Sequence, residues 1–209
     1  MKSIAPFLLG LMICTPSFAD YSDGFITTGE YEGFVSWSSS SPPLIVDGGG
    51  ANVIEMRMSG RLEVRSTSFP INENWHTGGI TDIVLLSNSH LDYLSGVTEE
   101  ITISTNATAD LYGGRIDAIT SMQFVGWVGR DWIDPHIDLY CRPGWSWLLD
   151  GQDKIGITGL WGNSISFSIE FINDEDYNPV WENINIIEIP EPTSLVMLTL
   201  GSLLIRRKK

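Results

Sequence analysis

Short runs in which apolar and polar residues alternate recur through the middle of the chain. Examples are NVIEMRM, RLEVRS, DIVLLS, HLDYLS, EITIST, HIDLYC and SISFSIEFI. A period of two places alternate side chains on opposite faces and therefore predicts half-buried strands. The glycine-containing stretches DGGG, TGG, YGG and RPG separate these runs and are typical of turns. Helical periodicity is scarce, so the sequence predicts an all-β fold.

The strand-like runs repeat at a fixed interval. When residues 82–98 are placed over residues 100–116, a shift of 18, apolar, amide, acidic and glycine positions coincide: Ile83 with Ile101, Leu85 with Ile103, Asn88 with Asn106, Asp92 with Asp110, and Gly96 with Gly114. Residues 136–141 echo 108–113, and residues 53–64 share the apolar spacing. A unit this short cannot bury its own apolar face and must stack on a neighbour. The pattern predicts a short β-solenoid over residues 20–140, with a β-sandwich as the alternative.

Residues 141–189 interrupt the repeat and are rich in tryptophan. The last coil of a solenoid needs a cover, because an open sheet edge recruits other chains. We interpret this stretch as a C-terminal β cap.

Both ends of the chain have the composition of targeting segments. Residues 1–19 carry Lys2, an apolar run over 4–13, and the small residues Ser17 and Ala19. This pattern predicts a secretory signal peptide cleaved between Ala19 and Asp20 by signal peptidase after recognition by the export machinery. A buried N-terminal helix is the alternative.

The last 20 residues combine three features. Pro190, Glu191 and Pro192 come first; a 12-residue apolar run over 194–205 follows; the chain ends with the four basic residues Arg206, Arg207, Lys208 and Lys209. The run is shorter than the roughly 20 residues of a complete transmembrane helix, and basic clusters stay on the cytoplasmic side. The segment predicts a transient inner-membrane intermediate; a plain membrane anchor is the alternative.

This tripartite tail resembles the PEP-CTERM sorting signal, and residues 45–140 resemble the Gly-rich solenoid segments of exported PEP-CTERM proteins. The resemblance implies that a membrane-embedded exosortase recognises residues 190–209, removes them, and releases or attaches the body at the cell surface.

Charge excludes some partners. Five of the 12 basic residues and one of the 26 acidic residues lie outside residues 20–189, which leaves 25 acidic against seven basic residues and a net charge of −18. Such a body repels nucleic acid and attracts divalent cations. Arg57, Arg61 and Arg65 are interpreted as an exposed row that offsets Glu55 and Glu63. Cys141 is the one cysteine of the mature chain, so no internal disulfide can form.

Two acidic stretches are candidate calcium ligands, because carboxylates gathered on a loop suit Ca²⁺. The first, DWIDPHID, contains Asp131, Asp134 and Asp138, and the alternation places His136 on the face of Asp138. The second contains Asp174, Glu175 and Asp176. A solvated loop and a solvated turn are the alternatives, with no cofactor at all.

Aromatic and catalytic candidates remain. Trp145, Trp147 and Trp161 lie among glycine and polar residues and either bind sugar rings by stacking or belong to the core. The chain has three histidines, and it contains no nucleophile elbow, zinc-protease motif or phosphate loop.

We therefore expect an exported protein without catalytic activity, structural or adhesive, in the cell envelope, the exopolysaccharide or a biofilm matrix. A carbohydrate-binding module that uses the tryptophans is one alternative, and a small polysaccharide-active enzyme with paired carboxylates is the other.

Overall fold

The computed structural model describes residues 24–38, 40, 42–67, 79–122, 133–173 and 177–190. Within this part the chain forms 14 β-strands and one short 3₁₀ helix. The all-β prediction is confirmed. The expected signal peptide (1–19) and residues 191–209 of the expected sorting tail lie outside the described residues, and Pro190 is the last described position.

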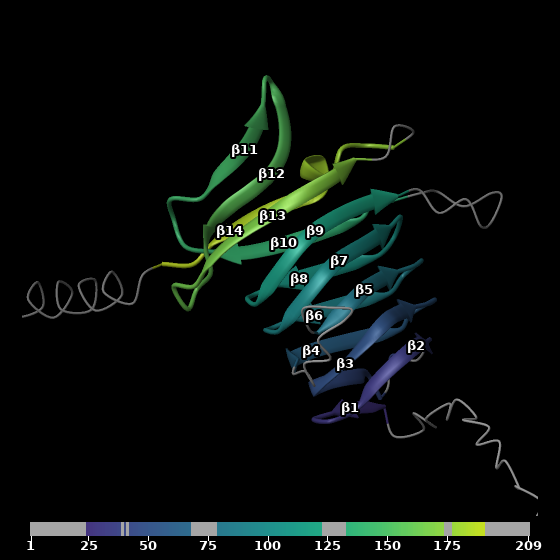
Figure 1. Cartoon of the computed structure of the whole chain (residues 1–209). Helices are drawn as coiled ribbons and strands as arrows, with labels where there is room; N and C mark the ends of the chain where they lie inside the picture. Colours follow the sequence, from purple (N-terminus) through teal and green to yellow (C-terminus); the bar gives the residue numbers. More distant parts are fainter. Residues whose placement is uncertain are drawn as a thin grey trace, which may run out of the picture.

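The strands follow one another along the chain (Figure 1), most of them joined by short corners, whereas longer segments separate β4 from β5 and β9 from β10. Their bounds are β1 Phe25–Thr27, β2 Tyr31–Trp37, β3 Leu44–Met56, β4 Arg61–Thr67, β5 Ile80–Leu85, β6 His90–Tyr93, β7 Val97–Ser104, β8 Thr108–Leu111, β9 Arg115–Met122, β10 His136–Cys141, β11 Ser146–Asp150, β12 Asp153–Leu160, β13 Ser166–Asn173 and β14 Ile184–Glu188. The 3₁₀ helix η1 spans Val180–Asn183.

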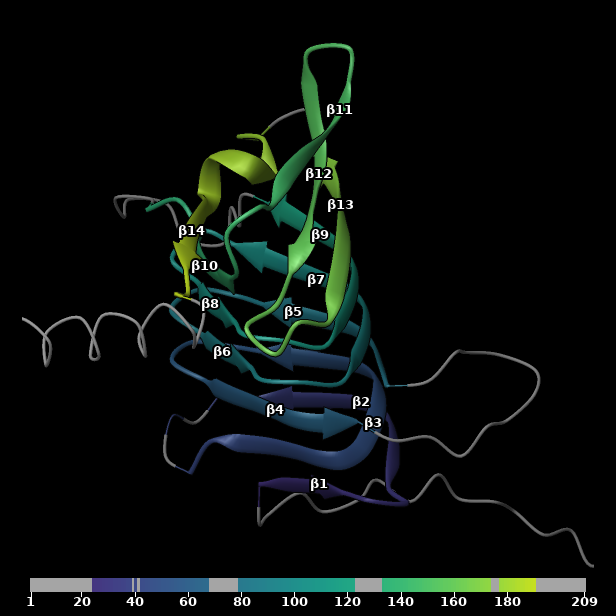
Figure 2. The ribbon, with the colours of Figure 1, turned by 90° about the vertical axis from the view of Figure 1, so that its left-hand side faces the viewer.

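The strands stack as two sheets of parallel strands, which Figure 2 shows from the side. Sheet A has the order β1-β3-β4-β6-β8-β10-β14, and sheet B has the order β2-β3-β5-β7-β9-β13. The long strand β3 runs through both sheets and bends at Gly48–Gly50, where positive φ and close contacts leave no room for side chains. Each coil thus contributes to both sheets, as in a β-solenoid. A β-sandwich, whose sheets are antiparallel, is excluded.

The stacking register is the one that the sequence repeat predicts. Residues 83, 85 and 92 lie beside residues 101, 103 and 110, a step of 18. Residues 54, 56, 62 and 64 lie beside 83, 85, 91 and 93, and residues 137–139 lie beside 109–111. The last two steps are 29 and 28 residues long because each includes an insertion, 68–78 or 123–132.

The core lies between the two sheets and consists of columns of inward-facing apolar side chains. In sheet B one column is formed by Val35, Ile54, Ile83, Ile101, Ile119 and Phe171. In sheet A another is formed by Leu44, Leu62, Leu91, Ala109 and Ile137. Burying each large aliphatic side chain contributes about 1.5–3 kcal/mol relative to exposing it. These columns explain how coils without an internal disulfide hold together. Cys141 is buried in the same core.

The C-terminal part closes the solenoid. Strands β13 and β14 add a further parallel coil on β9 and β10, so parallel stacking continues beyond residue 140. Sheet B then ends in the antiparallel strands β12 and β11, which rise at the end of the stack in both views. Trp161 follows β12 directly and is fully buried, with its ring centroid 4.3 Å from that of Phe167. Residues 141–189, predicted as a β cap, thus contain both a further parallel coil and an antiparallel extension of sheet B.

Candidate metal centre

The outer face of sheet A carries a row of carboxylates. Strands β6, β8 and β10 present Asp92, Asp110 and Asp138, each two residues after the start of its strand. Parallel register places Asp92 beside Asp110 and Asp110 beside Asp138. The first residues of these strands, His90, Thr108 and His136, form a second row next to the carboxylates. Alternation along each strand directs both rows outward, because the intervening residues face the core.

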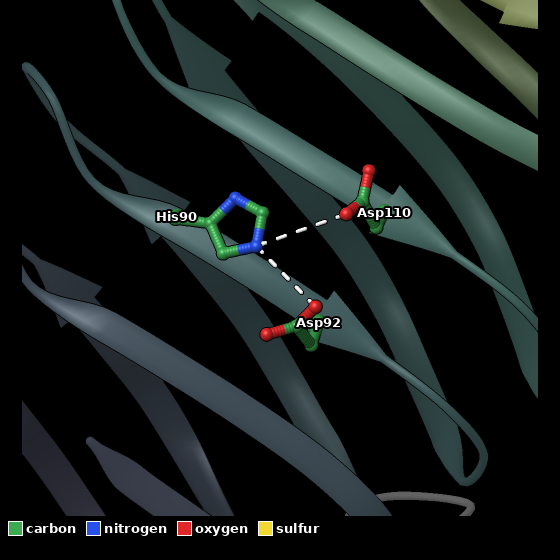
Figure 3. Close-up of side chains that lie close together, drawn as sticks. All are labelled: His90, Asp92 and Asp110. Atoms are coloured by element: carbon green, nitrogen blue, oxygen red, sulfur yellow. Dashed lines mark ion pairs between the residues drawn. The ribbon is translucent and has the colours of Figure 1, made fainter.

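The side chains of His90, Asp92 and Asp110, three potential metal ligands, converge on this face (Figure 3). Nε2 of His90 lies 3.3 Å from Oδ1 of Asp92 and 3.8 Å from Oδ2 of Asp110. Ligand atoms of the three residues all lie within 4.8 Å of one another. Their side chains are half-buried, with exposed fractions of 29%, 15% and 25% for His90, Asp92 and Asp110. Among the described residues this is the one group of three histidine, cysteine or acidic side chains so arranged.

Two further side chains hold this group in place. Nδ1 of His90 lies 2.7 Å from Oγ1 of Thr108, which belongs to the next coil. Arg61 on β4 donates to Oδ2 of Asp92 through Nε, at 3.0 Å, and through Nη2, at 2.6 Å. Nδ1 of His90 and Oδ2 of Asp92 therefore already have partners, whereas Nε2 of His90 and Oδ1 of Asp92 face each other.

Arg61 does not play the role expected from its sequence neighbours. Arg57 and Arg65 do pair with the nearby Glu55 and Glu63 as predicted, the latter pair at 2.7 Å. Arg61 instead pairs with Asp92, 31 residues further along the chain, because β4 and β6 are adjacent in sheet A.

The environment of Asp110 is unfavourable to its charge. Burial is the main cause that raises its pKa; the charges of Asp138 and Asp92 raise it further, whereas His90 and His136 lower it. Like charges placed directly opposite each other on adjacent strands repel. The middle of the carboxylate row is therefore the place where a bound cation would relieve most repulsion.

The predicted calcium ligands are placed differently. Asp138 lies 2.9 Å from Nε2 of His136, on the face that the alternation predicts, and accepts a hydrogen bond from Asn185 at 2.7 Å. Asp134 accepts a hydrogen bond from the Tyr177 hydroxyl at 2.9 Å. Neither belongs to the group of three around His90. The other candidates, Asp131, Asp174, Glu175 and Asp176, lie outside the described residues.

A polar pocket of about 420 Å³ opens beside the starts of β10 and β14. Its lining includes Asp134, Asn178, Glu182, Asn183 and Asn185, with few apolar atoms among them. The pocket thus offers hydrogen-bond donors and acceptors from two coils, next to Asp138, the last residue of the carboxylate row.

The three candidate sugar-binding tryptophans make packing and hydrogen-bond contacts within the protein. Trp161 is wholly buried and donates its indole N–H to the carbonyl of Gly114 at 2.7 Å, so its ring cannot stack on a sugar; its assignment to a sugar site is wrong. Trp145 and Trp147 are half-buried and pack edge to face at 5.2 Å. Trp145 also donates to Glu188 at 3.0 Å.

The centre at His90 was missed at the level of sequence. The signal that could have found it is the motif His-x-Asp, which occurs at 90–92 and 136–138 in positions that the repeat aligns.

Comparison of the chain with protein-family models, with curated proteins and with solved structures finds no match. Of the residues described here, none form a helix long and apolar enough to cross a membrane.

Proposed function

We propose that this chain is an exported, non-catalytic β-solenoid that serves as a structural or adhesive component of the cell surface or extracellular matrix. The observation that carries this proposal is the outer face of sheet A, where polar side chains repeat from coil to coil in strict register. A rigid surface with a regular spacing suits a partner that is itself repetitive, such as a matrix polysaccharide. Its acidic charge disfavours nucleic acid as a partner.

Export and sorting form part of this proposal and rest on the two ends of the sequence. Residues 1–19 direct the chain to the export machinery and to signal peptidase, and an exosortase processes the PEP-CTERM-like segment 190–209 after a transient stay in the inner membrane. The mature product is then located at the cell surface or outside the cell.

The test is to express the protein in its own host and in a strain that lacks exosortase, and to measure the intact mass and the location of the product. A surface product that begins at Asp20 and ends near residues 190–192 supports the proposal, provided that the deletion strain retains the tail. A membrane-bound product that keeps residues 206–209 in both strains contradicts it.

Polysaccharide binding is a second candidate function, favoured by the polar pocket beside β10 and β14. Trp161 is buried, and Trp145 and Trp147 are half-buried and pack against each other. We therefore propose this pocket, in place of the tryptophans, as the sugar-binding surface. A pull-down with the host's own exopolysaccharide tests it: Glu182→Gln and Asn178→Ala are expected to weaken retention. Glu32→Gln on β2, at the other end of the solenoid, is the control and is not expected to weaken it. Equal retention of all variants contradicts this assignment.

Calcium bound by the acidic loop around Asp134 also stays a proposal. Thermal unfolding with and without Ca²⁺ tests it, and an unchanged midpoint argues against it.

A further inference from the structure

We propose that His90, Asp92 and Asp110 form a binding site for one divalent transition-metal ion of the Zn²⁺ class, which ties two consecutive coils of the solenoid together. His90 and Asp92 come from β6, and Asp110 comes from β8. The site is distinct from the acidic loops considered above and needs no partner molecule. Three protein ligands leave one coordination position open toward solvent on the face of sheet A.

The spacing of the ligand atoms suits a small tetrahedral ion. Zinc binds nitrogen and oxygen ligands at about 2.0–2.2 Å, which in a tetrahedron separates neighbouring ligand atoms by about 3.3–3.6 Å. Nε2 of His90 already lies 3.3 Å from Asp92 and 3.8 Å from Asp110. Rotation of the partly exposed Asp110 side chain would shorten the 3.8 Å separation, and the ligand atoms of all three residues already lie within 4.8 Å of one another.

The hydrogen bonds that the proposed ligands make with Thr108 and Arg61 are of the kind found around metal ligands. A ligating histidine usually donates its remaining ring N–H to a protein acceptor, which fixes the tautomer. When Nδ1 of His90 carries the proton, it donates to Thr108 Oγ1 and leaves the lone pair of Nε2 directed at the carboxylates. Arg61 binds the far oxygen of Asp92 and so orients the near oxygen. Thr108 and Arg61 are thus positioning residues.

The donor set selects the class of ion. Calcium takes six to eight oxygen ligands, and this site offers two carboxylates and an imidazole. Imidazole nitrogen with carboxylate oxygen suits Zn²⁺ and neighbouring divalent ions of the first transition row. Thiolate-preferring ions are disfavoured, because Cys141 is buried in the core.

The chain contains its own control. His136 and Asp138 repeat the His-x-Asp motif on β10, but Asn185 of β14 occupies the position that Asp110 holds beside Asp92. Asp110 lies beside Asp138 on the β8 side, but its ligand atoms converge with those of His90 and Asp92 and not with those of His136 and Asp138. We expect the second motif to contribute nothing to Zn²⁺ binding.

The experiment uses the protein as purified from its host, treated with a chelator and titrated with Zn²⁺ by isothermal calorimetry. We expect one ion per chain, a higher unfolding temperature with Zn²⁺ than with Mg²⁺, and d–d absorption of a tetrahedral complex when Co²⁺ replaces Zn²⁺. His90→Gln and Asp110→Asn should weaken Zn²⁺ binding by more than about tenfold, and Thr108→Val by about tenfold. His136→Gln should leave Zn²⁺ affinity unchanged.

Three outcomes overturn the proposal: no saturable Zn²⁺ binding, equal affinity in wild type and Asp110→Asn, or an equal loss in His136→Gln. In the first case the three side chains form an ordinary polar contact between two coils. Circular dichroism of each variant in the absence of metal shows that the fold is intact, and Asp110→Asn keeps the size of the side chain if His90→Gln does not fold.

Discussion

Replacement of Gly114 by alanine tests why glycine recurs at the corners of the solenoid. Gly114 lies between β8 and β9 with a φ of +84°. A Cβ atom there would lie 2.7 Å from the carbonyl oxygen of Gly96 and 2.8 Å from the ring of Tyr93. The oxygen belongs to the backbone of the preceding coil, and Tyr93 is fully buried. Neither neighbour can move aside without shifting a coil.

The size of the effect follows from two contributions. A left-handed conformation costs an alanine about 1–2 kcal/mol, and overpacking a rigid site adds about 1–3 kcal/mol. Gly144→Ala is the matched control, since φ is +97° there and no atom lies within 4 Å of the added Cβ. We therefore expect a loss of about 2–5 kcal/mol in the free energy of unfolding for Gly114→Ala, and only the strain contribution for Gly144→Ala.

Urea unfolding followed by tryptophan fluorescence measures both variants. The midpoint should fall further for Gly114→Ala than for Gly144→Ala, with an unchanged slope if the unfolded state is the same. Equal losses for the two variants would refute the reasoning, because the aligned glycines would then serve the backbone conformation alone and not the close approach of coils.

Three other perturbations probe the cap and the core. Trp161→Ala should lower the free energy of unfolding by about 3–5 kcal/mol, because the indole is fully buried, and chemical denaturation would detect it. Burial raises the pKa of Cys141 to about 11 from an ordinary value of 9.0, so the folded state keeps the thiol protonated. The free energy of unfolding should therefore fall as the pH rises from 9 to 11. Cys141→Ala should make this fall with pH smaller, and an unchanged fall would contradict the raised pKa of the thiol. Nζ of Lys154 lies 3.8 Å from the ring centroid of Trp181 and 4.8 Å from that of Trp147, so Lys154→Met should cost about 0.5–1 kcal/mol while Lys154→Arg retains most of the contact, as thermal unfolding of the two variants would show.

The sequence by itself determined the strands and the way they stack. A period of two assigns each residue to the core or to the surface, and a repeat of 18 residues states which residues lie beside each other in successive coils. The pairings of Ile83 with Ile101 and of Asp92 with Asp110 follow directly. The alignment also contained the carboxylate row, because it placed the aspartates of three strands at one position. This works because the neighbours of a solenoid strand are copies of itself, displaced by a constant number of residues.

Only the tertiary structure decided what the repeat does not encode. The repeat places Arg61 beside His90 and Glu63 beside Asp92, but it does not state which carboxylate Arg61 contacts; side-chain orientation on sheet A pairs it with Asp92. The convergence of His90 on Asp110 depends on side-chain rotation across two coils. The burial of Trp161 depends on β13, which pairs with β9 although about 50 residues separate them. Local patterns specify the face on which a side chain lies, but its partner on that face is set by register and by the lengths of the segments between coils.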